Sequence, residues 1–227
     1  MSITGIAFIL AAYLWGAIPT SYLVARYRFG IDIREYGSGN VGASNALSLI
    51  GNVIGISIGT FDCVAKGILP VLLARLLDQS LAAQVGIGLA AIAGHNWSPF
   101  LGFTGGRGVA TAIGLLLVFW LWPEWIILGA AVGIVGMLIF KDTGFWTLVS
   151  LLALPVMAYL FQRPAEIIAL TLMIGVLLVA KRLTANWEPP DRREGRFRVY
   201  LYRILWDRDV ARKDEWTRRL PDSITKA

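Results

Sequence analysis

The chain has 227 residues, of which 56% are hydrophobic and only 16% are charged, and its mean hydropathy is +0.64. This composition excludes an ordinary soluble domain and predicts an all-α polytopic membrane protein. The single cysteine, Cys63, excludes an intrachain disulfide, and the single histidine, His95, cannot build a His-rich metal centre. We therefore expect no metal site.

Apolar runs recur along the chain at the length that a helix needs to cross the hydrocarbon core, about 20 residues. Pro123 favours a break between the fourth and fifth runs, because it removes a backbone donor and restricts Trp122. We predict about seven transmembrane helices, near residues 4–25, 52–76, 82–98, 109–122, 124–140, 145–161 and 166–180.

The positive charges predict the orientation of these helices. With the C-terminus in the cytoplasm, only about Arg75 and Arg163 lie outside, whereas the reverse orientation places nearly all the positive charge outside. We therefore expect the N-terminus outside and the C-terminus in the cytoplasm. Two glycine-rich loops, residues 37–45 and 102–108, then lie on the same, cytoplasmic side, where they could form a site for a phosphorylated or lipid-linked substrate.

The first of these loops reads "GSGNVGASN" and has no charged residue. Its glycines let the backbone turn back on itself, and its side chains offer hydroxyl and amide groups suited to the oxygens of a phosphate or polyol. The alternative is an interhelical turn in which a Ser or Asn caps the next helix. The residues concerned are Gly37, Ser38, Gly39, Asn40, Gly42, Ser44 and Asn45.

Two charges interrupt the second apolar run. Asp62 and Lys66 are four residues apart, so they share a helix face and can pair. Each charge at the centre of a span costs about 2.5–3.5 kcal/mol on insertion scales. Either the pair neutralises itself and locks helix packing, or Lys66 binds an anion from the cytoplasmic cavity while Asp62 orients it.

The segment "AGHNWSPFLGFTGGRGVATAIG" at 93–114 has a polar patch before a new helix. Gly105, Gly106 and Gly108 are predicted to leave backbone N–H groups exposed at the helix start, a geometry that favours an anion. Arg107 adds a guanidinium that can fork onto phosphate or carboxylate. His95 either positions or relays a proton, or is an interfacial histidine bonded to a neighbouring loop.

The basic excess lies at the C-terminus. From residue 181 to 227 there are 13 Lys or Arg against 8 Asp or Glu. We divide the chain into a membrane domain, 1–186, and a basic cytoplasmic tail, 187–227. The basic excess of the tail predicts contact with anionic membrane lipids and not with nucleic acid. Its pattern fits either a strand or a helix lying in the interface, and a tail simply appended at the membrane surface is the plainer alternative.

Three segments together resemble the bacterial membrane family of acyl-phosphate:glycerol-3-phosphate acyltransferases. They are "GSGNVGASN" (37–45), "DCVAKGILP" (62–70) and "GHNWSPFLGFTGGRGVAT" (94–111), and "DIRE" (32–35) also fits. The resemblance implies seven helices in the bacterial inner membrane, with the motifs at the cytoplasmic face. It also implies acyl transfer from acyl phosphate to the 1-hydroxyl of glycerol 3-phosphate, giving lysophosphatidic acid for phospholipid synthesis, with no cofactor or metal.

The resemblance also assigns roles to residues. As catalytic residues it implies Ser38, Asn45, Lys66 and His95. As residues that bind substrate or phosphate it implies Gly39, Asn40, Gly42, Ser44, Asp62, Gly105, Gly106, Arg107 and Gly108.

The sequence departs from the family pattern at cationic positions. Ser48 and Thr104 stand where the family often has Arg and Lys, and Arg107 replaces a Lys. The last helix ends with Lys181, Arg182 and Asn186, which could loosely replace a His/Arg/Asn-rich segment. These departures keep two alternatives in view, a non-catalytic or altered-acceptor paralogue and a transporter of a small phosphorylated solute.

Overall fold

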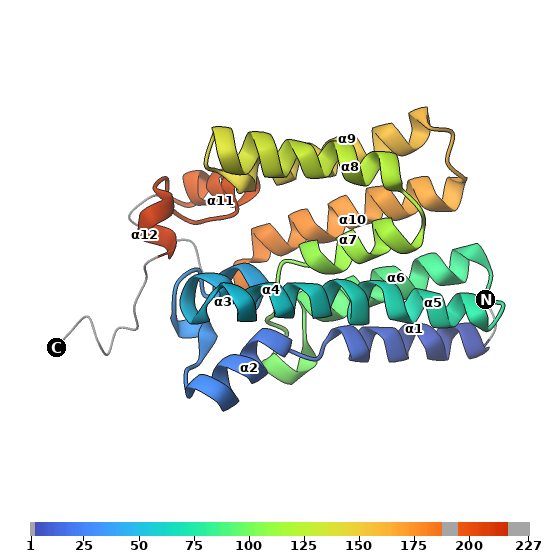
Figure 1. The fold of residues 1–227 in the computed structure, drawn as a ribbon, viewed down its shortest axis with the longest axis horizontal. Coiled ribbons are helices and arrows are strands. Elements are labelled where there is room, and N and C mark those ends of the chain that lie inside the picture. The colour runs from blue at the N-terminus through green and yellow to red at the C-terminus, as the bar shows by residue number, and fades with distance from the viewer. Residues whose placement is uncertain (1–2, 188–194, 218–227) are drawn as a thin grey trace.

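The computed structural model is all-α, as the composition predicts, and describes residues 3–187 and 195–217 (Figure 1). The helices are α1 (Ile3–Gly16), α2 (Thr20–Phe29), η1 (Ile33–Glu35), α3 (Ala43–Ile50), α4 (Asn52–Phe61), η2 (Asp62–Ile68), α5 (Leu69–Leu76), α6 (Leu81–Asn96), η3 (Pro99–Leu101), α7 (Val109–Val118), α8 (Trp122–Ala130), η4 (Ala131–Ile139), α9 (Thr143–Leu160), α10 (Ala165–Thr184), η5 (Ala185–Trp187), α11 (Arg196–Trp206) and α12 (Lys213–Thr217).

Five helical stretches are long and apolar enough to cross a membrane, namely Gly5–Phe29, Asn52–Leu76, Trp122–Ile139, Thr143–Leu160 and Ala165–Thr184. Helices form at the other two predicted positions, but α6 has 16 residues and α7 only 10. At 1.5 Å per residue they reach about 24 and 15 Å, less than the hydrocarbon core. The predicted count of seven spans is therefore not confirmed.

Prolines set two of the boundaries. Pro19 lies between α1 and α2, so the predicted span 4–25 is two helices separated by residues 17–19. Pro123 occupies the first turn of α8, where its missing N–H costs nothing. The predicted break before it is therefore observed, and α7 ends at Val118.

Glycines allow the closest helix contacts. Gly67 of η2 faces Gly114 of α7, and a Cβ at Gly67 would lie 2.9 Å from the Cα of Gly114. In the same way, side chains at Gly16 of α1 or Gly94 of α6 would collide with the backbone of the partner helix. These contacts bring the backbones of the two helix pairs together, as small residues do in membrane bundles.

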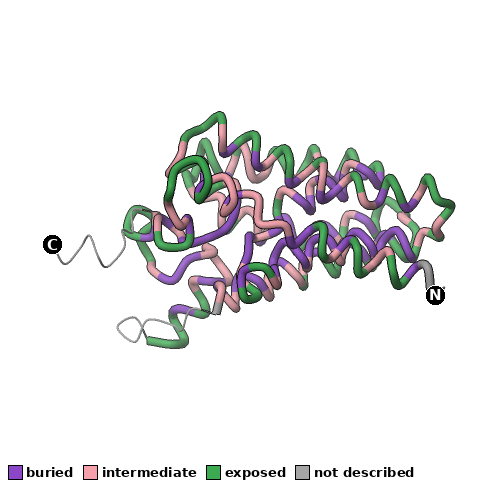
Figure 2. The backbone as a smooth tube through the Cα atoms, turned by 90° about the horizontal axis from the view of Figure 1, so that it is seen from below, coloured by how far each residue is buried: buried purple, intermediate pink, exposed green. Residues whose placement is uncertain are grey.

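The core lies between α5, α6, α7, α9 and α10. Its members include Val71, Ile92, Leu115, Leu170 and Ile174, all fully or nearly fully buried. Figure 2 shows buried backbone along the facing sides of the long helices and exposed backbone on their outer sides. The outer sides still carry large apolar side chains, as a surface facing lipid requires.

The C-terminal helices pack onto the bundle. Helix α11 contacts α9 and α10, and Val199 and Arg203 of this helix are buried. Of the two patterns left open for this segment, the helix is the one observed. Phe197, Tyr200 and Leu201 remain exposed on α11. Helices α11 and α12 lie at the end of the bundle that also holds α3, opposite the start of α1 (Figure 1).

Candidate active site

The two glycine-rich loops meet at one end of the bundle, as the sequence predicts. Loop 37–45 leads into α3, and loop 102–108 leads into α7. A Cβ at Gly42 would lie only 3.9 Å from the Cα of Gly106. The second motif, residues 62–70 beginning on η2, joins them through a small cavity of about 10 Å³ lined by Val41, Lys66 and Gly106, among other residues.

Asn45 holds the first loop in shape. Its Nδ2 lies 3.1 Å from both Ile33 O and Tyr36 O and 3.2 Å from Asn40 O, and its Oδ1 accepts the Ser38 N–H at 3.1 Å. Asn45 is buried, so these contacts are shielded from water. Its side chain is fully engaged by the backbone, and it therefore positions Ser38.

Backbone conformation supports the same loop. Gly37 and Gly39 have φ of 57° and 68°, which glycine adopts without strain. The N-cap of α3 is Gly42, with no side-chain cap, so the alternative of a Ser or Asn cap for this helix is wrong. The Oδ1 of Asn40, a buried residue, has no hydrogen-bond partner within the described ranges. That oxygen is enclosed by the protein and has almost no accessible surface.

Asp32 and Arg34 stabilise the turn that precedes the first glycine-rich loop. The Asp32 carboxylate accepts the Arg34 N–H at the start of η1, and the two side chains approach to 2.6 Å. The hydrogen bond from the Arg34 guanidinium lowers the pKa of the Asp32 carboxyl below its ordinary value.

Asp62 and Lys66 pair as predicted, in a closed cluster. Lys66 Nζ lies 2.7 Å from Asp62 Oδ1 and donates to Ile18 O at 2.7 Å, in the break between α1 and α2. His95 Nδ1 lies 3.9 Å from the second carboxylate oxygen of Asp62. All three side chains are buried, and the adjoining 10 Å³ has room for about one water.

This geometry fits a pair that neutralises itself and locks the helices. The pair lies on a π-helix, Asp62–Ile68, a form that is frequent at functional sites.

The second loop differs from its prediction at two amides. The Gly105 N–H donates to Asn186 Oδ1 at 3.0 Å, and the Gly106 N–H donates to His95 O at 3.0 Å. These amides are therefore not exposed to an anion. A side chain at Gly106 would collide with the His95 imidazole, so the glycine serves close packing. Gly108, at φ 74°, is the N-cap of α7.

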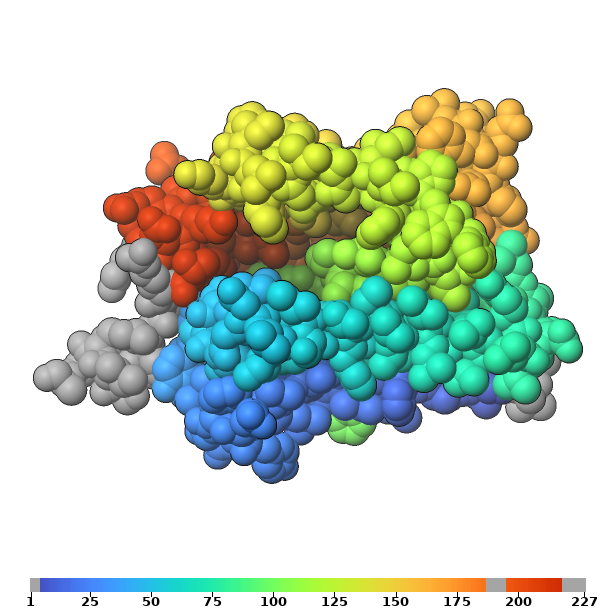
Figure 3. Space-filling view, viewed as in Figure 1, coloured from blue at the N-terminus to red at the C-terminus, as the bar shows by residue number. Residues whose placement is uncertain are grey.

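Arg107 projects from this loop into a larger polar cavity of about 450 Å³. The space-filling view is hollowed between the η4–α9 side and the α3–α4 side, with α11 at one end of the hollow (Figure 3). The cavity is lined by Ser38, Asn40, Ser44, Asn45, Leu47, Ser48, Arg107, Met137, Lys141, Asp142, Thr143, Gly144, Trp206, Asp207, Arg208, Lys213, Trp216 and Thr217. It is the chamber in which the first and third motifs face a common space.

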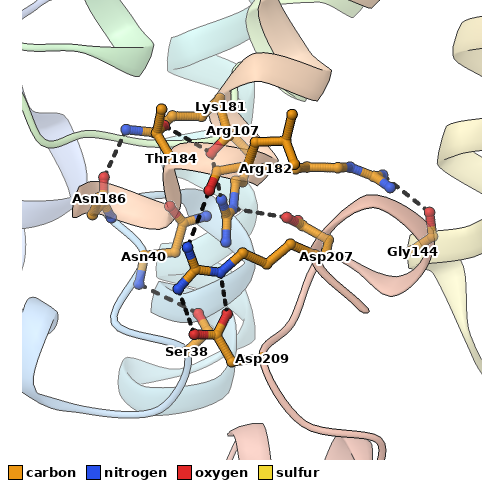
Figure 4. Close-up of polar contacts among 12 residues, drawn as sticks. Ser38, Asn40, Arg107, Gly144, Lys181, Arg182, Thr184, Asn186, Asp207 and Asp209 are labelled. Carbon is orange, nitrogen blue, oxygen red and sulfur yellow. Dashed lines mark hydrogen bonds and ion pairs between the residues drawn. The ribbon is translucent and has the colours of Figure 1, made fainter. Parts of the chain in front are cut away.

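Charges in the polar cavity form two pairs (Figure 4 shows the first). Arg107 Nε lies 3.1 Å from Asp207 Oδ1, and Arg107 also donates to Lys181 O at 3.0 Å. Arg208 lies 2.7 Å from Asp142. Lys141 and Lys213 also line the cavity and are in no ion pair within the described part of the chain. The cavity therefore keeps a positive excess.

Side chains at the end of α10 make hydrogen bonds to the elements that surround the site. Asn186 Oδ1 accepts from Lys181 Nζ at 2.6 Å as well as from Gly105, and Arg182 donates to Ile204 O and Gly144 O (Figure 4). Lys181, Arg182 and Asn186 do not line the polar cavity. They hold the glycine loop, α9 and α11 together.

Sequence reasoning missed the η4–α9 turn and the tail as cavity walls. Lys141 and Asp142 lie between two predicted spans on the side that holds the motifs, and this was the available signal. Within the described residues, no group of three or more His, Cys, Asp or Glu could hold a metal ion.

An apolar cavity of about 330 Å³ lies next along the same helices. It is lined by Val109, Ala112, Ile113, Leu116, Trp125, Leu128, Gly129, Val132, Gly133, Thr147, Ser150, Leu151, Leu154, Ile174 and Leu178. Thr147 is one helical turn from Thr143 of the polar cavity, and Gly133 is one turn from Met137. The site thus combines a charged chamber with an apolar one.

Known proteins are similar to this chain in sequence and in fold. The model of the family "Glycerol-3-phosphate acyltransferase" matches residues 6–188. A protein named glycerol-3-phosphate acyltransferase 5, from Dehalococcoides mccartyi, is 39% identical over 96% of this chain and 95% of its own. A glycerol-3-phosphate acyltransferase from Geobacter sulfurreducens is 37% identical over 83% of this chain and 95% of its own.

Among solved structures, the fold is similar to that of PlsY, an integral membrane glycerol 3-phosphate acyltransferase. Its glycerol 3-phosphate form superposes with a TM-score of 0.70 at 25% identity, over 79% of this chain and 88% of that one. Its lysophosphatidic acid form gives a TM-score of 0.69. The chain is a multi-pass membrane protein that belongs to the glycerol-3-phosphate acyltransferase family.

Proposed function

We propose that this enzyme transfers a fatty acyl group from acyl phosphate to the 1-hydroxyl of glycerol 3-phosphate, giving lysophosphatidic acid for phospholipid synthesis. The observation that carries the proposal is that a cationic polar cavity and an apolar cavity lie next to each other, near the glycine-rich loops 37–45 and 102–108. Acyl phosphate has the same division, since a phosphate is joined to a long apolar chain. Glycerol 3-phosphate is small and anionic and suits the polar chamber.

The chemistry needs little beyond position. Acyl phosphate is a mixed anhydride and is already activated. The acceptor oxygen forms an ester bond to the acyl carbon while the bond from that carbon to the phosphate oxygen breaks. The proton of the acceptor hydroxyl passes to the departing phosphate, which leaves as inorganic phosphate. Fixed positive charge and hydrogen-bond donors stabilise the negative charge on the leaving phosphate. No covalent nucleophile from the protein is required.

The residues divide into those that contact substrate and those that hold the site. We assign contact with substrate to Ser38, Asn40 and Arg107, which line the polar cavity. Asn45 positions Ser38 through the loop backbone. Asp62, Lys66 and His95 form the closed cluster behind the second glycine loop, and we assign them the support of both loops.

The apolar cavity is assigned to the acyl chain. Gly129 and Gly133 lie on its wall, and a Cβ at either would meet no atom within 4 Å. The wall is therefore open where a chain of methylene groups would lie. Burial of each methylene contributes about 0.8 kcal/mol, so the cavity can hold the donor while its phosphate reaches the charged chamber.

The test is acyl transfer by the purified full-length protein in liposomes. With palmitoyl phosphate and labelled glycerol 3-phosphate, we expect labelled lysophosphatidic acid and release of inorganic phosphate. A panel of polyol phosphates tests the acceptor, because Ser48 and Thr104 replace expected cations. Absence of product from every acceptor contradicts the proposal, and flux of labelled solute into sealed vesicles without product supports the transporter instead.

We also propose that the cavity end of the bundle is cytoplasmic, in the bacterial inner membrane, with the N-terminus outside. Positive charge gathers at this end. In a Cys63→Ser background, Asp78→Cys lies on the exposed turn between α5 and α6 and Ala211→Cys lies near α12. A membrane-impermeant thiol reagent should label the first and not the second in intact cells, and the reverse result contradicts this orientation.

A further inference from the structure

We propose that the C-terminal segment 206–217 is a wall of the substrate site and that Lys213 binds the phosphate group of a substrate. This inference rests on the proposed function of the polar cavity. The segment lies beyond residue 188, where the family match ends, so the match assigns it no role.

The segment is fixed in place by buried ionic contacts. Arg203 makes two hydrogen bonds to Asp209, at 2.8 and 2.6 Å, and donates to Leu183 O at the end of α10. Arg208 pairs with Asp142 at 2.7 Å and donates to Val210 O and Ala211 O. Because Arg203 and Arg208 are buried, these contacts hold residues 207–211 against the bundle.

These contacts bring α12 next to the first glycine-rich loop, residues 37–45. A Cβ at Gly37 would lie 3.4 Å from Thr217 O. The tail contributes Trp206, Asp207, Arg208, Lys213, Trp216 and Thr217 to the cavity wall, facing Ser38, Asn40 and Ser48 of the first motif and α3. The segment therefore forms part of the wall of the chamber.

Among the cationic side chains that the tail adds to the wall, Lys213 is the one with no ion pair within the described residues. Arg107 is paired with Asp207, and Arg208 with Asp142, so those charges balance. Within the described residues, Lys213 Nζ donates to a neutral group, Lys141 O, at 2.8 Å. That contact also places the Lys213 ammonium at the backbone of Lys141, the other lysine that lines the cavity.

The ammonium thus keeps its charge available to an anion. A phosphate monoester carries nearly two negative charges at neutral pH and suits two nearby cations.

The remaining wall fits the rest of such a ligand. Asn40 lines the same cavity, and an amide side chain there suits a hydroxyl of a polyol. Ser48, where the family pattern led us to expect an arginine, also lines the cavity. Lys213 supplies from the tail a positive charge that the first motif lacks. A phosphate with a neighbouring hydroxyl is the ligand chemistry that these groups recognise.

The test compares Lys213→Ala with Lys213→Arg and with Arg212→Ala in the full-length enzyme. Arg212 is exposed, pairs with Glu215 and does not line the cavity, so it controls for loss of tail charge. We expect Lys213→Ala to raise the KM for glycerol 3-phosphate about tenfold with kcat within about twofold. Lys213→Arg should restore most of the affinity, and Arg212→Ala should match the parent.

Varying each substrate in turn identifies the phosphate concerned. A raised KM for acyl phosphate alone assigns Lys213 to the donor, and a raised KM for glycerol 3-phosphate alone assigns it to the acceptor. Unchanged KM for both overturns the proposal, as does an Arg212→Ala effect equal to that of Lys213→Ala. Unchanged thermal unfolding of Lys213→Ala in detergent separates lost binding from lost folding.

Direct binding separates this proposal from the proposed function. Calorimetric titration of glycerol 3-phosphate, and of inorganic phosphate, into the parent and Lys213→Ala needs no turnover. If the parent makes no product but binds either phosphate more tightly than Lys213→Ala, the acyltransferase assignment fails and the tail site stands. Equal binding by both proteins, or none by the parent, overturns the tail site.

Discussion

Arg107 Nε and Asp207 Oδ1 lie 3.1 Å apart on the wall of the polar cavity, although one residue comes from the second glycine loop and the other from the tail. The carboxylate neutralises the guanidinium that we assign to substrate phosphate. A substrate anion must therefore share Arg107 with Asp207 or displace it. The ion pair sets the charge of the chamber before substrate arrives.

Replacing that carboxylate should strengthen phosphate binding. Asp207→Asn keeps the shape of the side chain and removes one negative charge from the cavity wall. We expect the KM for glycerol 3-phosphate to fall about threefold, with a smaller effect at high salt because salt screens the added charge. Steady-state kinetics at two ionic strengths measure this. A higher KM would show instead that Asp207 is needed to hold Arg107 in place.

Removing the Asn45 amide should disrupt the conformation of the first glycine-rich loop. Asn45→Ala leaves buried backbone carbonyls of Ile33 and Asn40 without this partner, which costs about 1–3 kcal/mol for each unsatisfied group. We expect kcat/KM to fall at least tenfold together with a lower unfolding temperature. The control is Ser57→Ala on α4, an exposed residue outside the polar cavity whose hydroxyl donates to Val53 O. Parental activity in Asn45→Ala contradicts the positioning role.

The buried pair on η2 offers a test of support against catalysis. Lys66→Met alone leaves Asp62 charged and unpaired, a change that costs about 3–5 kcal/mol in buried pairs. The double variant Asp62→Asn/Lys66→Met removes both charges and should recover most of that loss, as measured by unfolding in detergent. If the pair only supports the loops, the double variant also recovers activity. A stable but inactive double variant would return Lys66 to a catalytic role.

Filling the apolar cavity should change which acyl donors are used. Gly133→Leu places a side chain where the structure shows open space. We expect at least a tenfold loss of kcat/KM with palmitoyl phosphate and a much smaller loss with an eight-carbon acyl phosphate. Ile134→Leu, an exposed neighbour outside the cavity wall, is the control. Equal losses for both donors would place the acyl chain elsewhere.

The sequence predicts those features of the fold that depend on local pattern. Five of the seven predicted apolar runs coincide with helices long and apolar enough to cross a membrane. The spacing of Asp62 and Lys66 predicts their pairing because side chains four residues apart share a helix face. The meeting of the glycine-rich loops follows from counting spans, since both loops lie on one side. The all-α architecture and the family follow from the same residues.

Long-range partners are beyond this reasoning. Glycine at 105 and 106 is compatible with an exposed amide, but Asn186 and His95 O take the two N–H groups. Asn186 is 81 residues from Gly105, and no periodicity relates them. In the tail, the helical pattern was visible, whereas the pairing of Arg203 with Asp209 and of Arg208 with Asp142 depends on tertiary packing. The cavity wall contributed by the tail was missed for this reason.

The contact between Gly67 and Gly114 also bears on how a lipid-like donor reaches the site. It brings η2 and α7 too close for a hydrocarbon chain to pass between them. On the other face of α7, the apolar cavity runs past Gly129 and Gly133 toward the charged chamber. We therefore expect acyl phosphate to enter laterally from the surrounding leaflet, with its phosphate directed toward the charged chamber. Glycerol 3-phosphate, which is water-soluble, is expected to enter from the aqueous phase.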